Sequence, residues 1–187
     1  MKYSKIRKKL KDELDPKRYE HTLGVASTAV CLAMVYDEDL DKATTAGLLH
    51  DCAKCLTNEE RIKICKKNQI EITEAEYENP FLLHAKVGSY LAEKEYEVTD
   101  EDVLMAIRSH TTGRPGMSTL EKIIYVADYI EPNRNHSGRL PELRKLAFQD
   151  LDKALIQILK DTLGYLDTTD AKIDPMTKET YEYYCNK

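Results

Sequence analysis

Apolar residues recur every three to four positions along most of this sequence. In the segment 17–36, Leu23, Ala26, Val30 and Ala33 keep this spacing, which places them on one face of a helix. The composition agrees, because the chain has only 7 glycines, no tryptophan and long stretches rich in leucine, alanine, glutamate and lysine. We therefore expect an all-α fold, arranged as a helical bundle.

Capping signals mark where several of these helices begin. Thr57 and Ser118 are each followed three residues later by glutamate, the capping-box pattern that starts a helix. Apolar spacing and capping signals together predict helices over residues 3–14, 17–36, 41–53, 57–67, 99–110 and 150–163. They also predict one helix that opens at residue 80 and one from 118 to about 130. Residues 69–79 and 111–116 are expected to be loops, and the tail from Asp167 a polar segment with a turn at Asp174-Pro175.

The length and charge of the chain limit its possible functions. A chain of 187 residues without a linker or an internal repeat fits one domain, so we expect residues 1–187 to form a single unit. The net charge of −5 argues against nucleic acid as a partner. No apolar run reaches the roughly 18 residues that a membrane-spanning helix needs. Five cysteines, an odd number, suit reduced thiols, so we expect a cytoplasmic protein.

Four of the five histidines lie in, or at the end of, a predicted helix. His50 is followed directly by Asp51, and Asp128 adjoins the apolar run 123–127, where an unpaired carboxylate is costly to bury. Imidazoles and carboxylates are ligands of iron, manganese, cobalt and zinc, so a cation held by His21, His50 and Asp51 could be the partner of Asp128. The alternatives are an ion pair between Asp128 and an arginine, and a polar His50-Asp51 pair at the surface.

The order of these residues resembles that of a known family. His21, His50-Asp51 and Asp128 are similar to the H…HD…D pattern of the HD-domain metal-dependent phosphohydrolases. A closer resemblance, to the YqeK family of HD proteins, covers about residues 15–176 and is carried by segments 17–25, 50–54, 81–88 and 107–134. Ala85 departs from the glycine expected in relatives. The resemblance implies a single all-helical HD domain with a metal site at its centre, and symmetrical hydrolysis of diadenosine tetraphosphate to two ADP.

The resemblance also implies roles for particular residues. His21, His50, Asp51 and Asp128 would hold a divalent metal, iron first, with manganese, cobalt, nickel or zinc as other possibilities. His84 and His110 would either complete a second metal site, with Asp51 bridging, or hydrogen-bond the substrate phosphates. The catalytic set is then Asp51, His84 and His110. The substrate would contact His21, His84, His110 and Asp128. It would also contact a wider set comprising Arg18, Lys54, Thr111, Thr112, Gly113, Arg134, Ala171, Lys172, Ile173, Asp174, Pro175 and Met176.

The chemistry expected of such a site is hydrolysis without a protein nucleophile. A divalent metal lowers the pKa of its bound water from about 15.7 to about 7, which provides hydroxide for attack at neutral pH. The expected partners are a dinucleoside polyphosphate as substrate, ADP or GDP as a product-like ligand, and a second copy of the chain in a homodimer. Two alternatives stay open. One is an HD phosphohydrolase that acts on other nucleotides, and the other is a non-catalytic nucleotide-binding module.

Overall fold

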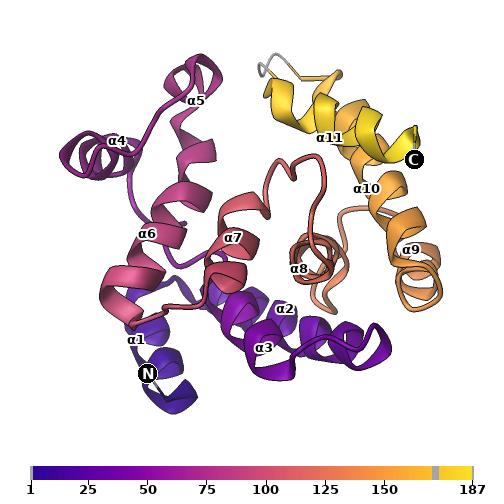
Figure 1. The fold of residues 1–187 in the computed structure, drawn as a ribbon, viewed down its shortest axis with the longest axis horizontal. Helices are drawn as coiled ribbons and strands as arrows, with labels where there is room; N and C mark the ends of the chain where they lie inside the picture. Colours follow the sequence, from indigo (N-terminus) through magenta and orange to yellow (C-terminus); the bar gives the residue numbers. More distant parts are fainter. Residues whose placement is uncertain (1, 170–172, 187) are drawn as a thin grey trace.

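The structure, a computed structural model, describes residues 2–169 and 173–186. Every regular element within these residues is a helix, which confirms the all-α prediction (Figure 1). The elements are α1 (Tyr3–Glu13), α2 (Pro16–Val35), α3 (Leu40–Leu49), α4 (Asn58–Lys67), α5 (Glu74–Glu78), the short 3₁₀ helix η1 (Pro80–Leu83), α6 (His84–Tyr96), α7 (Glu101–Ser109), α8 (Thr119–Ile130), α9 (Leu140–Ala147), α10 (Leu151–Leu166) and α11 (Pro175–Cys185).

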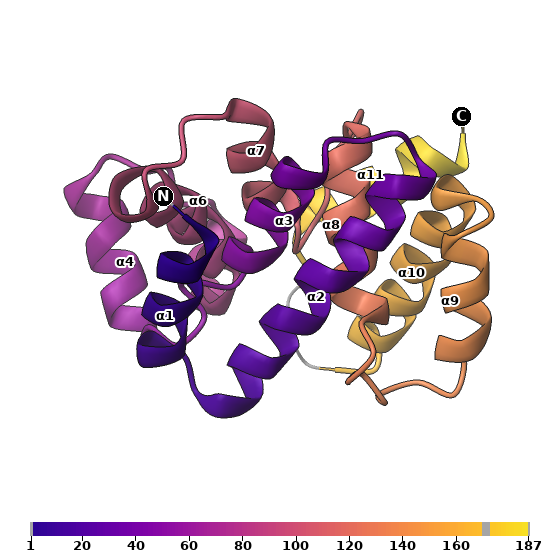
Figure 2. The ribbon, with the colours of Figure 1, turned by 90° about the horizontal axis from the view of Figure 1, so that it is seen from below.

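Helix α8 lies in the middle of the molecule. Figure 1 shows it nearly end-on, with α6 and α7 on one side and α9 to α11 on the other. In the view of Figure 2, α2 runs diagonally between the same two groups. Helix α8 packs against α2, α7 and α10, and its residues Ile123, Val126 and Ala127 are fully buried in the main core. The first half of the chain therefore meets the second half around α8.

Short polar side chains fix where the helices begin. The capping boxes predicted at Thr57 and Ser118 are both formed. Asp15 accepts a hydrogen bond from the backbone N–H of Arg18 at 3.0 Å, and Pro16 follows in the first turn of α2. A cap of this kind is worth about 1 kcal/mol. The capped start of α2 sets the rotation that turns His21 inward.

Two predictions of local structure were wrong, and one helix was missed. The expected loop over 69–79 contains α5, whose start has a capping box between Thr73 and Glu76. Helix α9 was not predicted. The polar tail forms α11, because Asp174 caps the helix and Pro175 occupies its first turn. The Asp-Pro pair expected to mark a turn is therefore a helix start.

Helix α3 ends earlier than expected. Helix α3 was predicted to reach residue 53 but ends at Leu49, and residues 50–55 form turns. This early end leaves His50 at the helix terminus. Among the described residues, no helix is long and apolar enough to span a bilayer.

Candidate metal centre

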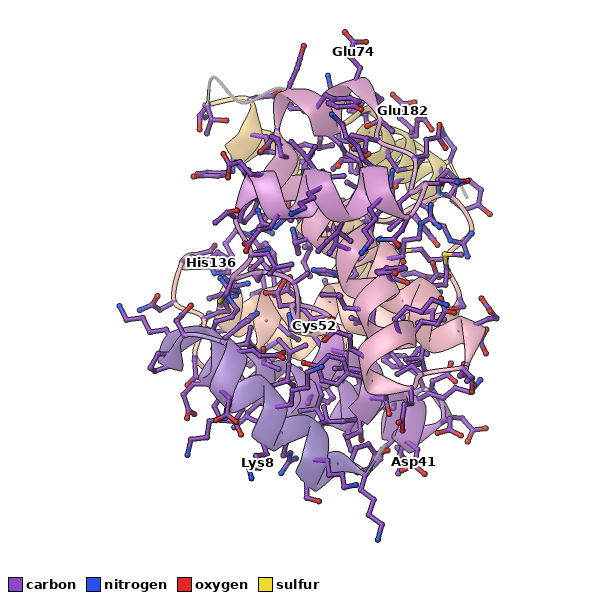
Figure 3. All side chains as sticks on the ribbon, turned by 90° about the vertical axis from the view of Figure 1, so that its left-hand side faces the viewer. Lys8, Asp41, Cys52, Glu74, His136 and Glu182 are labelled. Atoms are coloured by element: carbon purple, nitrogen blue, oxygen red, sulfur yellow. The ribbon has the colours of Figure 1, made fainter. Side chains whose placement is uncertain are left out.

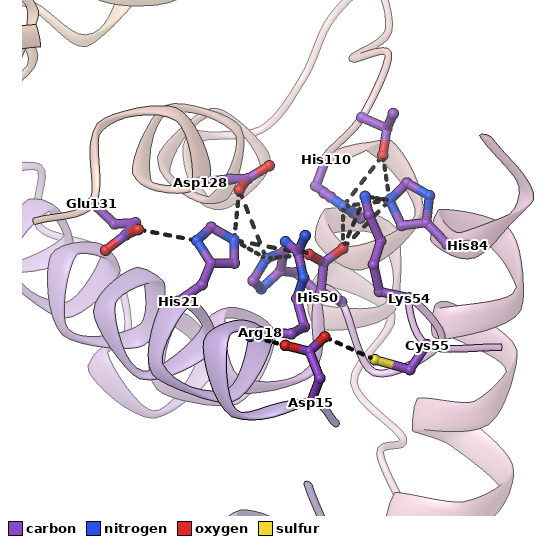
Figure 4. Close-up of polar contacts among 12 residues, drawn as sticks. Asp15, Arg18, His21, His50, Lys54, Cys55, His84, His110, Asp128 and Glu131 are labelled. Carbon is purple, nitrogen blue, oxygen red and sulfur yellow. Dashed lines mark hydrogen bonds and ion pairs between the residues drawn. The ribbon is translucent and has the colours of Figure 1, made fainter. Parts of the chain in front are cut away.

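Six imidazole and carboxylate side chains from five helical segments converge near the start of α6 (Figure 4). Their burial is high for polar groups, since His50 and His84 have no exposed surface and Asp51 is 1% exposed. The members are His21 on α2, His50 and Asp51 after α3, His84 at the first position of α6, His110 after α7, and Asp128 on α8. The residues that the sequence singled out as ligands thus lie together.

Asp51 stands between two histidine pairs. Its Oδ2 atom lies 3.5 Å from His50 Nε2 and 3.8 Å from His21 Nε2. Its Oδ1 atom lies 3.4 Å from the Nε2 atoms of both His84 and His110. Asp51 forms one group with His21 and His50 and another with His84 and His110. The ligand atoms within each group lie within 4.8 Å of one another, so each group could hold a metal ion. Figure 4 shows His21 and His50 on one side and His84 and His110 on the other.

The tautomers of these histidines favour a cation between them. The Nδ1 atoms of His50, His84 and His110 lie 2.6–2.8 Å from backbone carbonyl oxygens. A carbonyl only accepts, so each Nδ1 carries the hydrogen and donates it. The Nε2 lone pairs then face inward, and those of His84 and His110 are 3.1 Å apart. Two lone pairs repel at that distance unless a proton or a metal lies between them, so the donor set suits a divalent ion.

The carboxylates provide the same indication. Asp51 Oδ1 is buried and has no hydrogen-bond partner within the described part of the chain, although the Lys54 ammonium lies 3.4 Å away as an ion pair. Asp128 Oδ1 lies 3.0 Å from His21 Nε2. A buried carboxylate oxygen without a donor is costly, and a metal ion would remove that cost. The residues therefore fit a bound divalent cation.

The charges in the centre keep both aspartates ionised. Burial would raise the pKa of Asp51, but His50 and Lys54 outweigh it and hold that pKa well below its usual value. Burial likewise raises the pKa of Asp128, and its hydrogen bond with His21 outweighs this and lowers the pKa. Burial and the Lys54 ammonium hold the pKa of His84 well below its usual range. Ionised carboxylates and a neutral His84 are the forms that bind metals.

Glu131 is a member of the site that the sequence did not indicate. Its carboxylate is 1% exposed, and Oε1 accepts a hydrogen bond from His21 Nδ1 at 3.1 Å. The other oxygen accepts the backbone N–H of Asn133 at 2.7 Å. Position 24 must be glycine for this carboxylate to fit, because a Cβ there would clash with Oε2. Such a carboxylate holds a ligand histidine in one tautomer and orientation.

Three cationic side chains that were predicted to contact phosphate form ion pairs with the aspartates of the centre. Arg18 Nη1 lies 2.7 Å from Asp51 Oδ2, and Arg134 Nη2 lies 2.8 Å from Asp128 Oδ1. The ion pair between Asp128 and an arginine, considered above as an alternative to metal binding, is therefore formed. Lys54 Nζ lies 3.4 Å from Asp51 Oδ1 and 2.9 Å from His84 Nε2, and burial lowers its pKa. The cations gather at the centre itself rather than on a separate surface.

The predicted nucleotide-contacting segments meet at one recess. It has a volume of about 290 Å³, and its lining includes Thr111, Thr112, Gly113, Asp174 and Met176. Thr111 Oγ1 lies 3.0 Å from His84 Nε2, which joins this recess to the second histidine pair. We refer to it as the Thr111 recess.

The remaining predicted contacts do not line the Thr111 recess. Ile173 and Pro175 are described but are absent from its lining, whereas Ala171 and Lys172 lie outside the described residues. Arg134 instead lines two other recesses, one beside His21 and one beside Asp128. His136, which the sequence did not assign to the site, is exposed and packs edge-on against Tyr129.

Comparison with known proteins identifies the family. The HD domain model matches residues 18–133, more than half of the chain. The chain belongs to the HD domain family. This HD protein is 47% identical over 174 residues to a Bacillus subtilis (strain 168) protein named symmetrical bis(5'-nucleosyl)-tetraphosphatase, covering 93% of this chain and 92% of that protein. A Staphylococcus aureus (strain NCTC 8325 / PS 47) protein of the same name is 38% identical, covering 98% and 95%.

A solved structure has the same fold. The crystal structure of a Clostridium acetobutylicum protein, described as a predicted HD superfamily hydrolase involved in NAD metabolism, matches with a TM-score of 0.96. Its sequence is 47% identical, and the match covers 100% of this HD protein and 98% of that chain. These relatives confirm the resemblance found in the sequence and the helical HD fold.

Proposed function

We propose that this HD protein hydrolyses dinucleoside tetraphosphates symmetrically, so that diadenosine tetraphosphate yields two ADP. The names of the relatives from Bacillus subtilis and Staphylococcus aureus support this substrate. The observation that carries the proposal is the Asp51 carboxylate, which directs one oxygen toward each inward-facing histidine pair. A site with this donor set suits divalent-metal hydrolysis of a phosphate anhydride.

We propose that His21, His50, Asp51 and Asp128 hold one divalent ion, and that His84 and His110 hold a second with Asp51 as the bridge. Iron is the proposed metal, as the resemblance to the YqeK family implies, and mixed imidazole and carboxylate ligands are compatible with it. When bound, such an ion lowers the pKa of water and polarises a phosphoryl oxygen. Glu131 would keep His21 turned toward the ion through its hydrogen bond with Nδ1.

Arg18, Arg134 and Lys54 would bind the substrate phosphates once a metal ion occupies the carboxylates. Arg18 and Arg134 now neutralise Asp51 and Asp128. A metal ion on those carboxylates would release the guanidinium groups, whose planar forks match phosphate oxygens. Lys54, which is 2.9 Å from His84 Nε2, would likewise move onto a phosphate. The same side chains would thus neutralise the carboxylates and bind the substrate.

One half of the substrate would occupy the Thr111 recess. Thr111, Thr112 and Gly113 line it from one side, and Asp174 and Met176 from the other. Seating one nucleoside diphosphate there would direct its second phosphate to the centre through Thr111, next to His84 and His110. The water oxygen then bonds to that phosphorus, the bridging P–O bond breaks, and the other half leaves as ADP with the bridging oxygen.

Chromatography of the early products tests this function. Metal-loaded protein should convert diadenosine tetraphosphate to ADP alone, and in ¹⁸O-labelled water each turnover should place one heavy oxygen on one of the two ADP molecules. Release of ATP with AMP would overturn the symmetrical assignment. A panel of nucleoside mono- and triphosphates tests the alternative substrates, and binding without turnover across iron, manganese, cobalt and nickel would indicate a binding module.

Three further expectations belong to the same proposal. We propose that residues 1–187 act as one HD domain, because one core cluster includes residues from Ile6 on α1 to Tyr184 on α11. A cytoplasmic location follows from a soluble nucleotide substrate and is tested by cell fractionation. A homodimer, with ADP or GDP as product-like ligands, is tested by analytical ultracentrifugation with and without nucleotide.

A further inference from the structure

A recess larger than the Thr111 recess is lined by Asp128 and Arg134. Its volume is about 780 Å³, which is within the range of small-molecule sites. It is formed by the end of α8, the loop that follows, and the C-terminal half of α10. Figure 3 shows one of its lining residues, His136, toward the outer edge of the molecule. We name it the Tyr165 recess after its most exposed aromatic side chain.

The two recesses open on opposite halves of the centre. Thr111 joins the smaller recess to His84 and His110. Asp128 and Arg134 line the Tyr165 recess, and Asp128 contacts His21. An extended polyphosphate that crosses the centre from the Thr111 recess would therefore arrive at Arg134 and enter the Tyr165 recess.

The lining of the Tyr165 recess suits a nucleoside. Tyr165 is 68% exposed although it lies on a helix, so its ring is free to stack on a base. Asp161 Oδ1 accepts hydrogen bonds from Arg139 at 2.7 Å and from Gln157 at 2.9 Å, while its Oδ2 is buried and has no hydrogen-bond partner in the described structure. An acceptor of this kind would pair with an amino or hydroxyl donor of a ligand.

A glycine keeps the floor of this recess open. Gly164 lies within α10, where glycine costs about 1 kcal/mol relative to alanine. No packing requires it, because a Cβ added there would meet nothing within 4 Å. The backbone beside Tyr165 is thus bare on the side that lines the recess.

We propose that the Tyr165 recess binds the nucleoside of the leaving half of the substrate. Tyr165 stacks on its base, Asp161 accepts a hydrogen bond from a base amino or ribose hydroxyl group, and Arg134 binds the phosphates between the two halves. The inference rests on the proposed symmetrical hydrolysis. It explains why a molecule with two identical halves would be held at two chemically different recesses.

Two substrates separate this role from catalysis itself. Diadenosine tetraphosphate has a nucleoside on both sides of the cleaved bond, whereas adenosine 5'-tetraphosphate has one and would give ADP and diphosphate. Loss of base stacking costs about 1–3 kcal/mol, so Tyr165→Ala should lower kcat/KM for the dinucleotide at least about fivefold. The value for adenosine tetraphosphate should stay unchanged. Gly164→Leu, which fills the recess, should do the same without lowering the melting temperature.

Tyr183→Ala is the matched control, because Tyr183 is an exposed tyrosine outside the recess and should leave both substrates unaffected. Equal losses on both substrates would assign Tyr165 to the half that they share, and this would overturn the inference. So would unchanged kinetics in both Tyr165→Ala and Gly164→Leu. A wild-type protein that does not produce two ADP would instead remove the proposed function, and the inference with it.

Discussion

Substitution of Gly24 by alanine should weaken metal binding although residue 24 contacts no metal ligand. The added Cβ would clash with Glu131 Oε2 and lie 3.1 Å from its Cδ and 3.3 Å from Asn133 Nδ2. Helix α2 cannot retreat easily, because the neighbouring Thr22 and Val25 are fully buried. Glu131 must therefore move and release His21. Loss of such a supporting carboxylate costs about 10- to 100-fold in metal affinity, or about 1.4 to 2.8 kcal/mol.

Thermal unfolding with and without manganese measures this loss. At a metal concentration 100 times the wild-type Kd, binding stabilises the protein by about 2.7 kcal/mol, and a 10- to 100-fold weaker site leaves about 1.4 to 0.4 kcal/mol. The melting temperature without metal should change little, because alanine stabilises the helix by about 1 kcal/mol relative to glycine and this offsets the cost of displacing Glu131. Titration calorimetry gives the affinity directly.

Two variants control for other effects of Gly24→Ala. Glu131→Gln should weaken metal binding in the same direction without the clash. Ser27→Ala, at an exposed position on the same helix, should bind metal as the wild type does. Wild-type metal affinity in both Gly24→Ala and Glu131→Gln would refute the supporting role assigned to Glu131.

Three other outcomes are expected. Asp51→Asn should abolish metal retention while the protein stays helical, as measured by metal analysis and circular dichroism, and full metal occupancy would contradict the bridging role. Arg134→Ala should keep the metal but raise the Kd for ADP, with Arg134→Lys recovering part of the loss; unchanged binding would place the side chain outside the site. The pKa of Asp128 is lowered in the folded state, so its ionised form adds stability that is fully present above the unfolded pKa of about 3.9, declines below it, and is lost as the pH falls through the folded pKa. Metal-free wild type should therefore unfold at a higher urea concentration than Asp128→Asn at pH 7, and a gap that does not narrow as the pH falls below about 3.9 would contradict the lowered pKa.

The clustering of these side chains could be predicted because His21, His50, Asp51 and Asp128 each lie on or next to a helical pattern that is visible locally, and because their order resembles that of a known family. The same reasoning could not find Glu131. It lies 110 residues from His21 in the sequence, and its contact depends on how α2 and α8 cross. Gly24 is equally uninformative in sequence, since only the packed structure reveals the carboxylate that needs its space. The roles of all these residues in catalysis stay predictions.

The C-terminal helix illustrates a different limit. Helix α11 buries only Thr177, Thr180 and Tyr184, so it lacks the apolar stripe that reveals an amphipathic helix. Its start, Asp174-Pro175, occurs both in turns and at helix N-termini, and the polar residues that follow favoured the turn. In contrast, α5 has a capping box at Thr73 like those that were recognised, and its misassignment came from its length of only 5 residues.

The position of Asp51 between helices from both halves of the chain has a consequence for the life of the protein in a cell. Ions bound around it would tie α2, α3, α6, α7 and α8 together, and unfolding any of them would require the ions to leave. Metal-starved cells would then contain a chain that opens more often and is degraded faster. We expect metal supply to set the abundance of this protein as well as its activity, and pulse-chase measurements in chelator-treated cells would detect the shortened half-life.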